Sequence, residues 1–230
     1  MEHVDKEYCL QVCGDFACFT RPELKVERVS YDVITPSAAR AIFQALFWKP
    51  AIQWQVTRIE VLNPIKFFSV QRNEVKVKMS KTPILIEEAR TQRASYILRD
   101  VAYRIFARMI FIPVEKRTGA CLQESLRRRQ EGKAQDENPK KYQEIFERRA
   151  RQGQFFTPPY LGCREFSCTR VEWIPNASYG NGIPDSRDLG IMLYDLDFSS
   201  DAQSPVPLFF RAKLEHGVIQ VPQDEKEILR

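Results

Sequence analysis

Two helix-start signals, set far apart in the chain, constrain its fold most, because strand-like sequence flanks each of them. At the first signal, Thr35 can cap a helix whose first position holds proline and whose apolar face runs to about Phe47. The second signal is Asn138-Pro139, and its helix runs to about Arg151, before Gly153. We therefore predict two helices, each set between strands.

Strand-like segments fill most of the remaining sequence up to residue 166. Their apolar residues alternate or cluster between turn residues such as Gly14-Asp15 and Asn63-Pro64. The resulting order of strand, helix, three strand regions, helix and strand is close to the split β-α-β plan of ferredoxin-like domains. We expect an α+β fold with a ferredoxin-like (RRM-like) domain over residues 1–175. The predicted strands cover residues 7–13, 53–62, 65–75, 100–112 and 155–166.

The last part of the chain has a different pattern. Asparagine, glycine and proline form a loop over 176–184, and short strands are predicted at 189–194 and 207–214. We therefore expect a small C-terminal antiparallel β extension over 176–230. A polar and basic stretch around Leu126–Lys133 predicts an insertion in the first domain, at about 115–137.

Charge is unevenly distributed over the 230 residues, whose formal net charge is +5. Residues 171–230 hold 5 of the 35 basic and 10 of the 30 acidic residues, so they carry −5 and the rest of the chain +10. A basic body with an acidic tail suits a polyanionic partner on one side. No apolar run approaches the ~18–20 residues of a membrane span, and no secretory signal is evident. We expect a cytoplasmic protein without a membrane partner.

The six cysteines predict neither a disulfide framework nor a strong metal site. They are too sparse in a chain of this length for a disulfide-rich fold. Zinc sites usually pair cysteines as C-x2-C, whereas the spacings here are longer, and only His3 and His216 can add nitrogen ligands. We expect reduced thiols, with a structural metal as the alternative. The cysteines are Cys9, Cys13, Cys18, Cys121, Cys163 and Cys168.

Signatures of cofactor or metal chemistry are missing from the sequence. It contains no Walker-type phosphate loop, no HExxH pair and no Gly-x-Ser-x-Gly elbow. Asp195 and Asp197 can share one strand face as metal ligands, but an exposed strand end explains them better. We expect no cofactor and no metal.

Eight short segments, spread in order over residues 7 to about 222, carry a resemblance to a known family. They are Asp15–Tyr31, Thr35–Arg40, Trp48–Trp54, Arg72–Val75, Leu98–Tyr103, Tyr160–Phe166, Leu189–Asp195 and Phe209–Ala212. In this order they resemble the signatures of the type I-C (Dvulg subtype) CRISPR endoribonucleases. These are the d-type members of the fifth Cas group and belong to the RAMP superfamily.

The resemblance implies a ferredoxin-like protein that cuts precursor crRNA at the base of each repeat hairpin. It implies metal-independent attack of a ribose 2′-OH on the adjacent phosphate, which requires a base, a cation and an acid. The protein would stay on the 5′ handle of the crRNA, with the backbone and large subunits of the type I-C effector complex as partners. The alternative is a non-catalytic subunit of the same complex that binds the crRNA handle.

The resemblance also assigns catalytic positions, and the chain departs from the family pattern at two of them. A family tyrosine before the Trp-Lys-Pro segment corresponds to Phe47, which cannot do acid–base chemistry and is expected to pack or to stack on a base. A family Lys-His pair corresponds to Lys141-Tyr142. Lys141 retains the cation for the phosphorane charge. Tyr142 can act as base or acid, can hold a phosphate, or can simply pack on a neighbour.

Basic residues provide the candidate RNA contacts, with ordinary solvated charges as the alternative reading. Tyr31 and Trp48 can stack on bases or fill the core, and we expect Trp48 in the core. Non-specific binding of DNA is a further outcome of such a basic surface, and metal-dependent DNA cleavage ranks below both RNA functions. The candidate RNA-binding residues are Arg21, Lys25, Arg28, Lys140, Arg148, Arg149 and Arg164.

Overall fold

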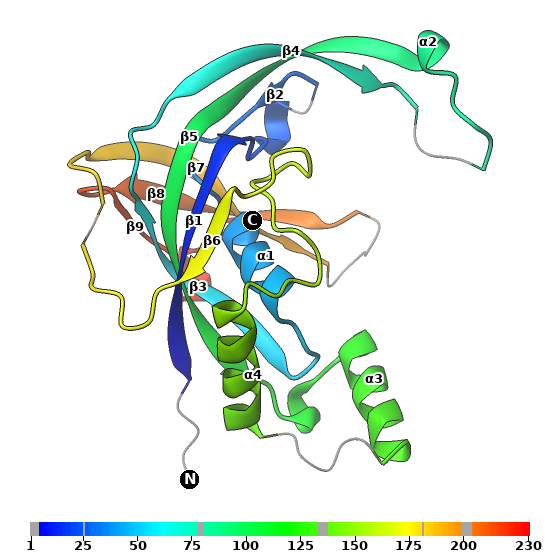
Figure 1. Cartoon of the computed structure of the whole chain (residues 1–230), viewed down its shortest axis with the longest axis vertical. Helices are drawn as coiled ribbons and strands as arrows, with labels where there is room; N and C mark the ends of the chain where they lie inside the picture. The colour runs from blue at the N-terminus through cyan, green and yellow to red at the C-terminus, as the bar shows by residue number, and fades with distance from the viewer. Residues whose placement is uncertain (1–4, 25, 78–80, 133–137, 181, 199–203) are drawn as a thin grey trace.

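One long strand, β5 (Arg90–Phe111), is the axis of the main sheet (Figure 1). Its second half pairs antiparallel with β1 (Lys6–Ala17) on one side and with β3 (Ile52–Val61) on the other. Its first half pairs with β4 (Phe67–Val75), and the two strands form an arm that extends from the body. The computed structural model describes residues 5–24, 26–77, 81–132, 138–180, 182–198 and 204–230.

The order of strands in the main sheet is β6-β1-β5-β3-β9. Strand β6 (Arg170–Trp173) pairs antiparallel with β1, and β9 (Val218–Gln220) pairs antiparallel with β3. The short strand β2 (Arg28–Val29) is parallel to β5. The predicted mixture of helices with an antiparallel sheet is confirmed.

Both predicted helices form where their capping residues place them. Helix α1 (Pro36–Leu46) begins after Thr35, whose hydroxyl accepts a hydrogen bond from the Ala38 amide at 3.3 Å. Helix α4 (Pro139–Arg151) begins after Asn138, whose side chain accepts from the Lys140 amide at 2.9 Å. These side-chain oxygens satisfy amides that a helix leaves unpaired at its start.

Aromatic packing fixes α4 against the sheet and α1. The Phe146 side chain is fully buried, with its ring centroid 4.6 Å from that of Tyr8 and 4.8 Å from that of Trp54. Phe43 of α1 completes the cluster, 6.2 Å from Phe146 and 4.8 Å from Trp54. A buried aromatic cluster of this kind makes α4 a fixed part of the body.

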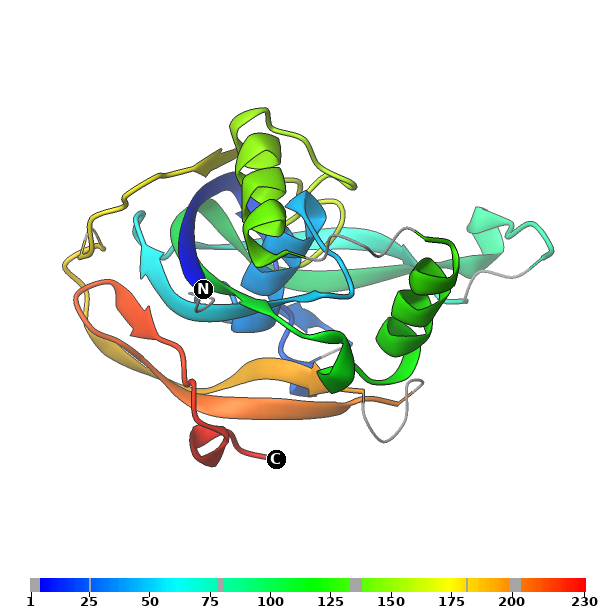
Figure 2. The same cartoon turned by 90° about the horizontal axis from the view of Figure 1, so that it is seen from below.

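The C-terminal part of the chain divides between two sheets. Strands β7 (Arg187–Asp197) and β8 (Val206–Leu214) form a separate two-stranded sheet, in agreement with the strands predicted there. Helix α1 contacts β3 of the main sheet on one side and β7 on another, and Figure 2 shows the hairpin lying along this side of the body. Met192 and Phe210 of the hairpin are buried in the same core as α1.

Three further helical features lie outside the ferredoxin-like plan. Helix α3 (Gly119–Gln130) occupies the predicted polar insertion and lies near the end of α4 (Figures 1 and 2). Helix α2 (Ile86–Ala89) caps the tip of the β4–β5 arm. Single turns of 3-10 helix cover Pro22–Leu24, Val114–Lys116 and Glu225–Glu227. No helix within the described ranges is long and apolar enough to cross a membrane.

Two strand predictions are wrong in detail. Residues 155–166 form turns with one isolated bridge between Tyr160 and Ser167, and the last strand of the plan is β6 instead. Strand β5 begins at Arg90 and not near Asp100, because Asp100, at φ 54°, bends the strand without ending its pairing. Only the half of β5 after this bend is buried enough to give a clear apolar pattern.

Candidate functional site

The three positions predicted to be catalytic come together where α4 meets the end of α1. The ring centroid of Tyr142 is 6.3 Å from that of Phe47 and 6.1 Å from that of Phe111. Lys141 is the preceding residue on α4, and its side chain is exposed, like that of Lys140. The tyrosine is half-buried beside a hollow formed by Ile52, Met109, Phe111, Pro139 and Gln143.

Phe47 has the packing role that its side chain allows. Only 1% of it is exposed, and it joins the core. Its backbone carbonyl accepts a hydrogen bond of 2.8 Å from the indole nitrogen of Trp54. Phe47 therefore holds the end of α1 against β3 and supplies no acid, base or exposed stacking surface.

The arginines of α4 have different environments. Arg149 donates to the Leu46 carbonyl at 2.7 Å and to the Gln154 carbonyl at 3.2 Å, and its guanidinium lies 4.1 Å from the Phe156 ring. Burial, followed by the nearby charge of Arg148, lowers the pKa of Arg149 below its ordinary value. Arg149 thus fastens α4 to the last turn of α1. Arg148 is exposed.

The other predicted RNA contacts lie elsewhere. Arg21 is 3.3 Å from the Asp32 carboxylate and lies over the Tyr31 ring, which is buried in the core. Arg28 is 2.7 Å from the Glu74 carboxylate. Arg164 is exposed in the loop after Gly162. The structure therefore gathers only the α4 residues around Tyr142, and Lys25 lies outside the described residues.

The cysteines form no disulfide and no metal centre. All six are free thiols, and within the described ranges no group of three or more histidine, cysteine or acidic side chains is arranged to hold a metal ion. Cys163 shares a hydrogen bond with Cys18, and this bond, followed by the charges of Arg28 and Arg72, lowers the pKa of Cys163. The pKa of Cys18 is raised by the same hydrogen bond and by burial.

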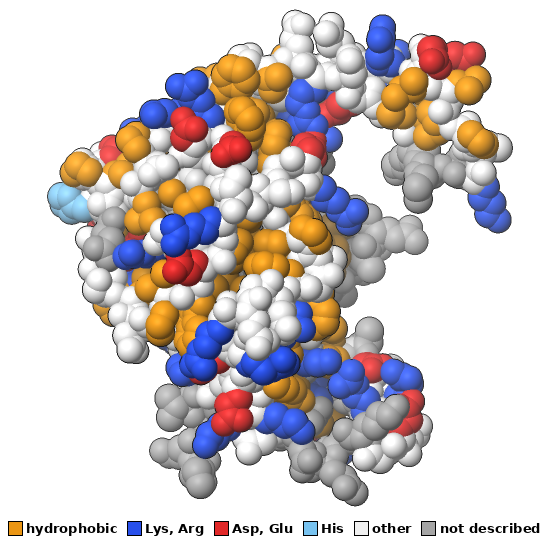
Figure 3. Space-filling view, viewed as in Figure 1, with side chains coloured by type: hydrophobic (Ala, Val, Ile, Leu, Met, Phe, Trp, Pro, Cys, Tyr) orange, Lys and Arg blue, Asp and Glu red, His pale blue; other side chains and the backbone are white. Residues whose placement is uncertain are grey.

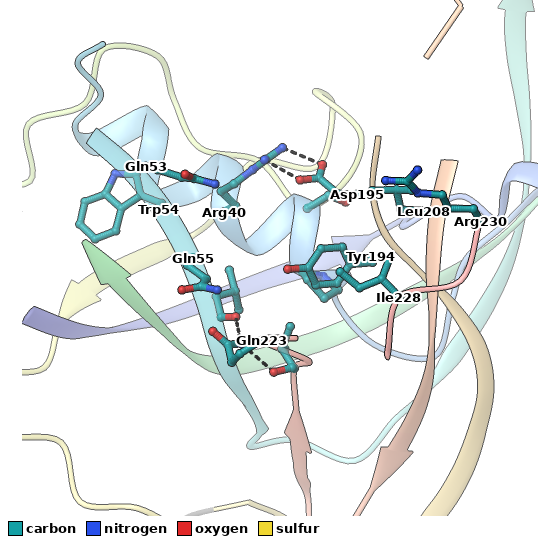
Figure 4. Close-up of a pocket in the computed structure, with 14 residues that line it drawn as sticks. Arg40, Gln53, Trp54, Gln55, Tyr194, Asp195, Leu208, Gln223, Ile228 and Arg230 are labelled. Atoms are coloured by element: carbon teal, nitrogen blue, oxygen red, sulfur yellow. Dashed lines mark hydrogen bonds and ion pairs between the residues drawn. The ribbon is translucent and has the colours of Figure 1, made fainter. Parts of the chain in front are cut away.

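A polar cavity of about 300 Å³ lies on the other side of α1, between α1, β3 and the β7–β8 hairpin (Figure 4). Arg40 Nη1 is 2.5 Å from Asp195 Oδ2, and Nη2 is 2.8 Å from Oδ1, so the two side chains form a two-pronged ion pair. Burial raises the pKa of Asp195, and Arg40 opposes that shift. The Asp195 carboxylate, considered above as a metal ligand, is therefore occupied by an arginine.

Two residues that follow α1 were not among the predicted RNA contacts. Trp48 is 44% exposed, so the expectation that it lies in the core is wrong, and the core tryptophan is Trp54. Lys49 is half-buried, and burial, followed by the charges of Arg128 and Arg149, lowers its pKa. The Trp-Lys-Pro segment was quoted only for its family resemblance, and an exposed aromatic residue next to a basic one was the signal within it.

Basic side chains gather over the lower end of α4 and toward α3, as Figure 3 shows from the same side as Figure 1. An antiparallel α+β body with such a surface defines the broad class of polyanion-binding α+β proteins. The chain belongs to the d-type branch of the family described as CRISPR-associated protein (Cas_Cas5), whose model matches residues 7–222.

Two curated relatives are similar over almost their whole length. "CRISPR pre-crRNA endoribonuclease Cas5d" of Mannheimia succiniciproducens is 43% identical over 93% of this chain and 93% of its own. The protein of the same name from Thermus thermophilus is 39% identical over 96% of this chain and 93% of its own. A solved structure titled "Crystal Structure of CRISPR-associated Protein" has a TM-score of 0.66 at 21% identity and covers both chains fully, which supports the fold alone.

Proposed function

We propose that this chain is a pre-crRNA endoribonuclease that binds the repeat hairpin of precursor crRNA and cleaves at the hairpin base. The observation that carries this proposal is the identity of 39–43%, over more than nine-tenths of the chain, with two proteins named for that activity. The basic surface over α4 and α3 supports it, because RNA binding needs cations to neutralise phosphates.

The architecture is proposed to be a ferredoxin-like domain over residues 1–175 with a β extension over 176–230. The path β1-α1-β3-β5-α4-β6, with neighbouring strands in the order β6-β1-β5-β3, supports this assignment. Helix α3 then belongs to an insertion at about 115–137. Within this plan α4 is the second helix of the domain, and its first turn carries the proposed catalytic residues.

The proposed reaction is an in-line transesterification. The 2′-oxygen forms a bond to the adjacent phosphorus, the bond from phosphorus to the 5′-oxygen breaks, and a 2′,3′-cyclic phosphate and a 5′-OH result. Tyr142 takes the proton of the 2′-OH as phenolate, or gives a proton to the leaving 5′-oxygen as phenol. Lys141 stabilises the charge that develops on the phosphorane oxygens. This mechanism needs no cofactor and no metal.

A second candidate is a subunit that binds the 5′ handle of the crRNA without cutting it. It is favoured by the buried Phe47, which lacks a hydroxyl, and by the apolar surroundings of Tyr142. Both candidates act in the cytoplasm with crRNA, in a complex with the backbone and large subunits of a type I-C effector. Both also allow non-specific DNA binding.

Incubation of the purified protein with its own labelled repeat RNA in EDTA separates the candidates. The endoribonuclease gives one specific cut and a 2′,3′-cyclic phosphate end, identified by its resistance to periodate until the ring is opened. Tight binding without cleavage at any pH from 6 to 9.5 selects the handle-binding subunit. Absence of both contradicts both.

A further inference from the structure

The turn that follows α1 presents an exposed aromatic side chain on a rigid backbone. Trp48 is 44% exposed, whereas a tryptophan in a solvated turn with no ligand is usually buried more deeply. The backbone around it is fixed, because the Phe47 amide donates to Phe43 and the Ile52 amide donates to the Lys49 carbonyl, both at 2.9 Å. The indole is therefore preorganised to receive a flat partner.

A lysine without an acidic partner lies next to this tryptophan. Lys49 is half-buried, and within the described part of the chain its ammonium group makes no recorded hydrogen bond or ion pair. The charges that act on it most are those of Arg128 on α3 and Arg149 on α4, which repel it. A partly buried cation among cations is unfavourable unless an anion also binds there.

The nearby carboxylate does not neutralise this group. Glu124 Oε1 is 2.9 Å from Arg128 Nε, and Glu124 Oε2 is 3.0 Å from Arg127 Nε, so both its oxygens are engaged on α3. The Leu46 carbonyl at the end of α1 is likewise taken by Arg149. Three cations from three elements thus face one position where the chain supplies no free anion.

The chemistry of this position matches one nucleotide. A flat exposed indole provides a stacking surface for a base of any sequence, and an ammonium group one residue away can reach the phosphate of the same nucleotide. We infer that Trp48 and Lys49 form a subsite for one unpaired nucleotide of the RNA, in which the indole stacks on the base and Lys49 binds its phosphate. The inference rests on the proposed function, because it assigns this nucleotide to the repeat RNA.

The position of the subsite gives it a role in cleavage. Phe47, the residue before Trp48, contacts Tyr142 of the proposed catalytic pair. A nucleotide held on Trp48 is therefore held next to the bond to be cut. We expect the subsite to align an unpaired nucleotide that flanks the hairpin, so its loss weakens binding and also slows cleavage under saturating protein.

The test uses the full chain with its own labelled repeat RNA and with a series of RNAs that each carry one abasic ribose. Trp48→Ala should weaken binding of the intact RNA by about fivefold or more, and Trp48→Phe by less. One abasic position should weaken wild-type binding by a similar factor but leave the affinity of Trp48→Ala unchanged. Lys49→Ala should lower the slope of log affinity against log salt by about one, and Lys49→Arg should retain it.

Two exposed residues on the β4–β5 arm serve as matched controls. Phe68→Ala removes an exposed aromatic ring and Lys66→Ala an exposed lysine, and neither should change affinity or cleavage. Thermal unfolding of every variant verifies that it is folded. Wild-type affinity in Trp48→Ala, with cleavage intact, overturns the inference and leaves the proposed function standing, also if Trp48→Ala then fails to join other subunits. If wild type neither binds nor cuts the repeat RNA, the proposed function and the inference both fail.

Discussion

The two ends of α1 solve the problem of a half-buried cation in opposite ways. Near its start, Arg40 meets both oxygens of Asp195 on β7 and the pair closes one wall of a cavity. Just past its end, Lys49 has two arginines as its main electrostatic neighbours and no acid of its own within the described residues. The first arrangement is complete within the chain, whereas the second is completed by an anion from outside.

This contrast separates structural charges from functional ones better than charge counts do. Arg21 and Arg28 were candidate RNA contacts, but each lies within 3.3 Å of a carboxylate of the chain. The residues around the end of α1 and the start of α4 instead share an uncompensated positive field (Figure 3). A half-buried cation without an acid partner is costly to keep, so it marks a binding site.

The largest effect is expected from separating the uncompensated end from the sheet. Phe146→Ala removes the ring that packs on Tyr8, Phe43 and Trp54 and leaves a cavity under α4. The free energy of unfolding should fall by about 3–5 kcal/mol, measured by denaturant titration. Cleavage should be lost even at temperatures where the sheet is folded. Phe146→Leu, which fills most of the space, should lose less than half as much stability.

Removing the proposed catalytic cation should affect chemistry far more than binding. Lys141→Ala should lower the single-turnover cleavage rate by about 100-fold, because its charge matters most when the phosphorane forms. Affinity for the repeat RNA should change by less than about threefold. Lys141→Arg should restore part of the rate. Equal losses of rate and affinity would assign Lys141 to binding alone.

Breaking the compensated end should cost stability and leave RNA binding intact. Arg40→Met leaves the partly buried Asp195 carboxylate without its cation and should lower the free energy of unfolding by about 2 kcal/mol at pH 7. The pKa of Asp195 is raised in the folded state, so its charge opposes folding once the pH exceeds the ordinary aspartate range. The variant should therefore regain stability from pH 7 to pH 5 relative to wild type. Melting curves at both pH values check this, and Asp195→Asn in the same background should abolish the regain.

Tyr142 can be tested through the pH dependence of cleavage. If its phenolate is the base, the cleavage rate should rise from pH 7 toward pH 9, because an ordinary tyrosine has a pKa of ~10. Tyr142→Phe should lower the rate at pH 9 by about tenfold or more and remove the rise, with binding unchanged. Tyr142→His should move the activity toward neutral pH. Equal rates in wild type and Tyr142→Phe would show that another group is the base.

The smallest effect should have the opposite sign at the uncompensated end. The pKa of Lys49 is lowered in the folded state, chiefly by burial, so its charge opposes folding at every pH below that pKa. Lys49→Met should therefore raise the melting temperature in the absence of RNA by about 1–2 °C, or ~0.5 kcal/mol. The same variant should bind repeat RNA less well. A lower melting temperature would mean that Lys49 has a stabilising partner after all.

The sequence predicted the helices of this fold well because their signals are local. Thr35 and Asn138 cap α1 and α4 in the structure as their residue types require. The exchange of β6 for residues 155–166, and the early start of β5, could not be predicted, because pairing across distant strands decides them. Apolar patterns show burial, and the first half of β5 lies in an exposed arm where that pattern is weak.

The site was predicted in part for the same reason. The aligned positions Phe47, Lys141 and Tyr142 do meet, although nothing local in the sequence joins them. Trp48 was expected in the core because a tryptophan after an amphipathic helix usually packs there. The extended conformation of Phe47, at φ −156°, turns the chain so that Phe47 is buried and Trp48 is exposed. The partners of Arg40 and Arg149 are likewise distant in sequence, so only the fold reveals which cations are compensated.

The central claim is that RNA lies at the end of α1 and the start of α4 and not in the cavity near the start of α1. Ultraviolet cross-linking of bound repeat RNA, followed by mass spectrometry of the attached peptides, tests it in one measurement, since each region contains aromatic residues. We predict that RNA attaches to peptides that contain Trp48 or Tyr142. Attachment at Tyr194 in the cavity, with none at Trp48 or Tyr142, would contradict the account.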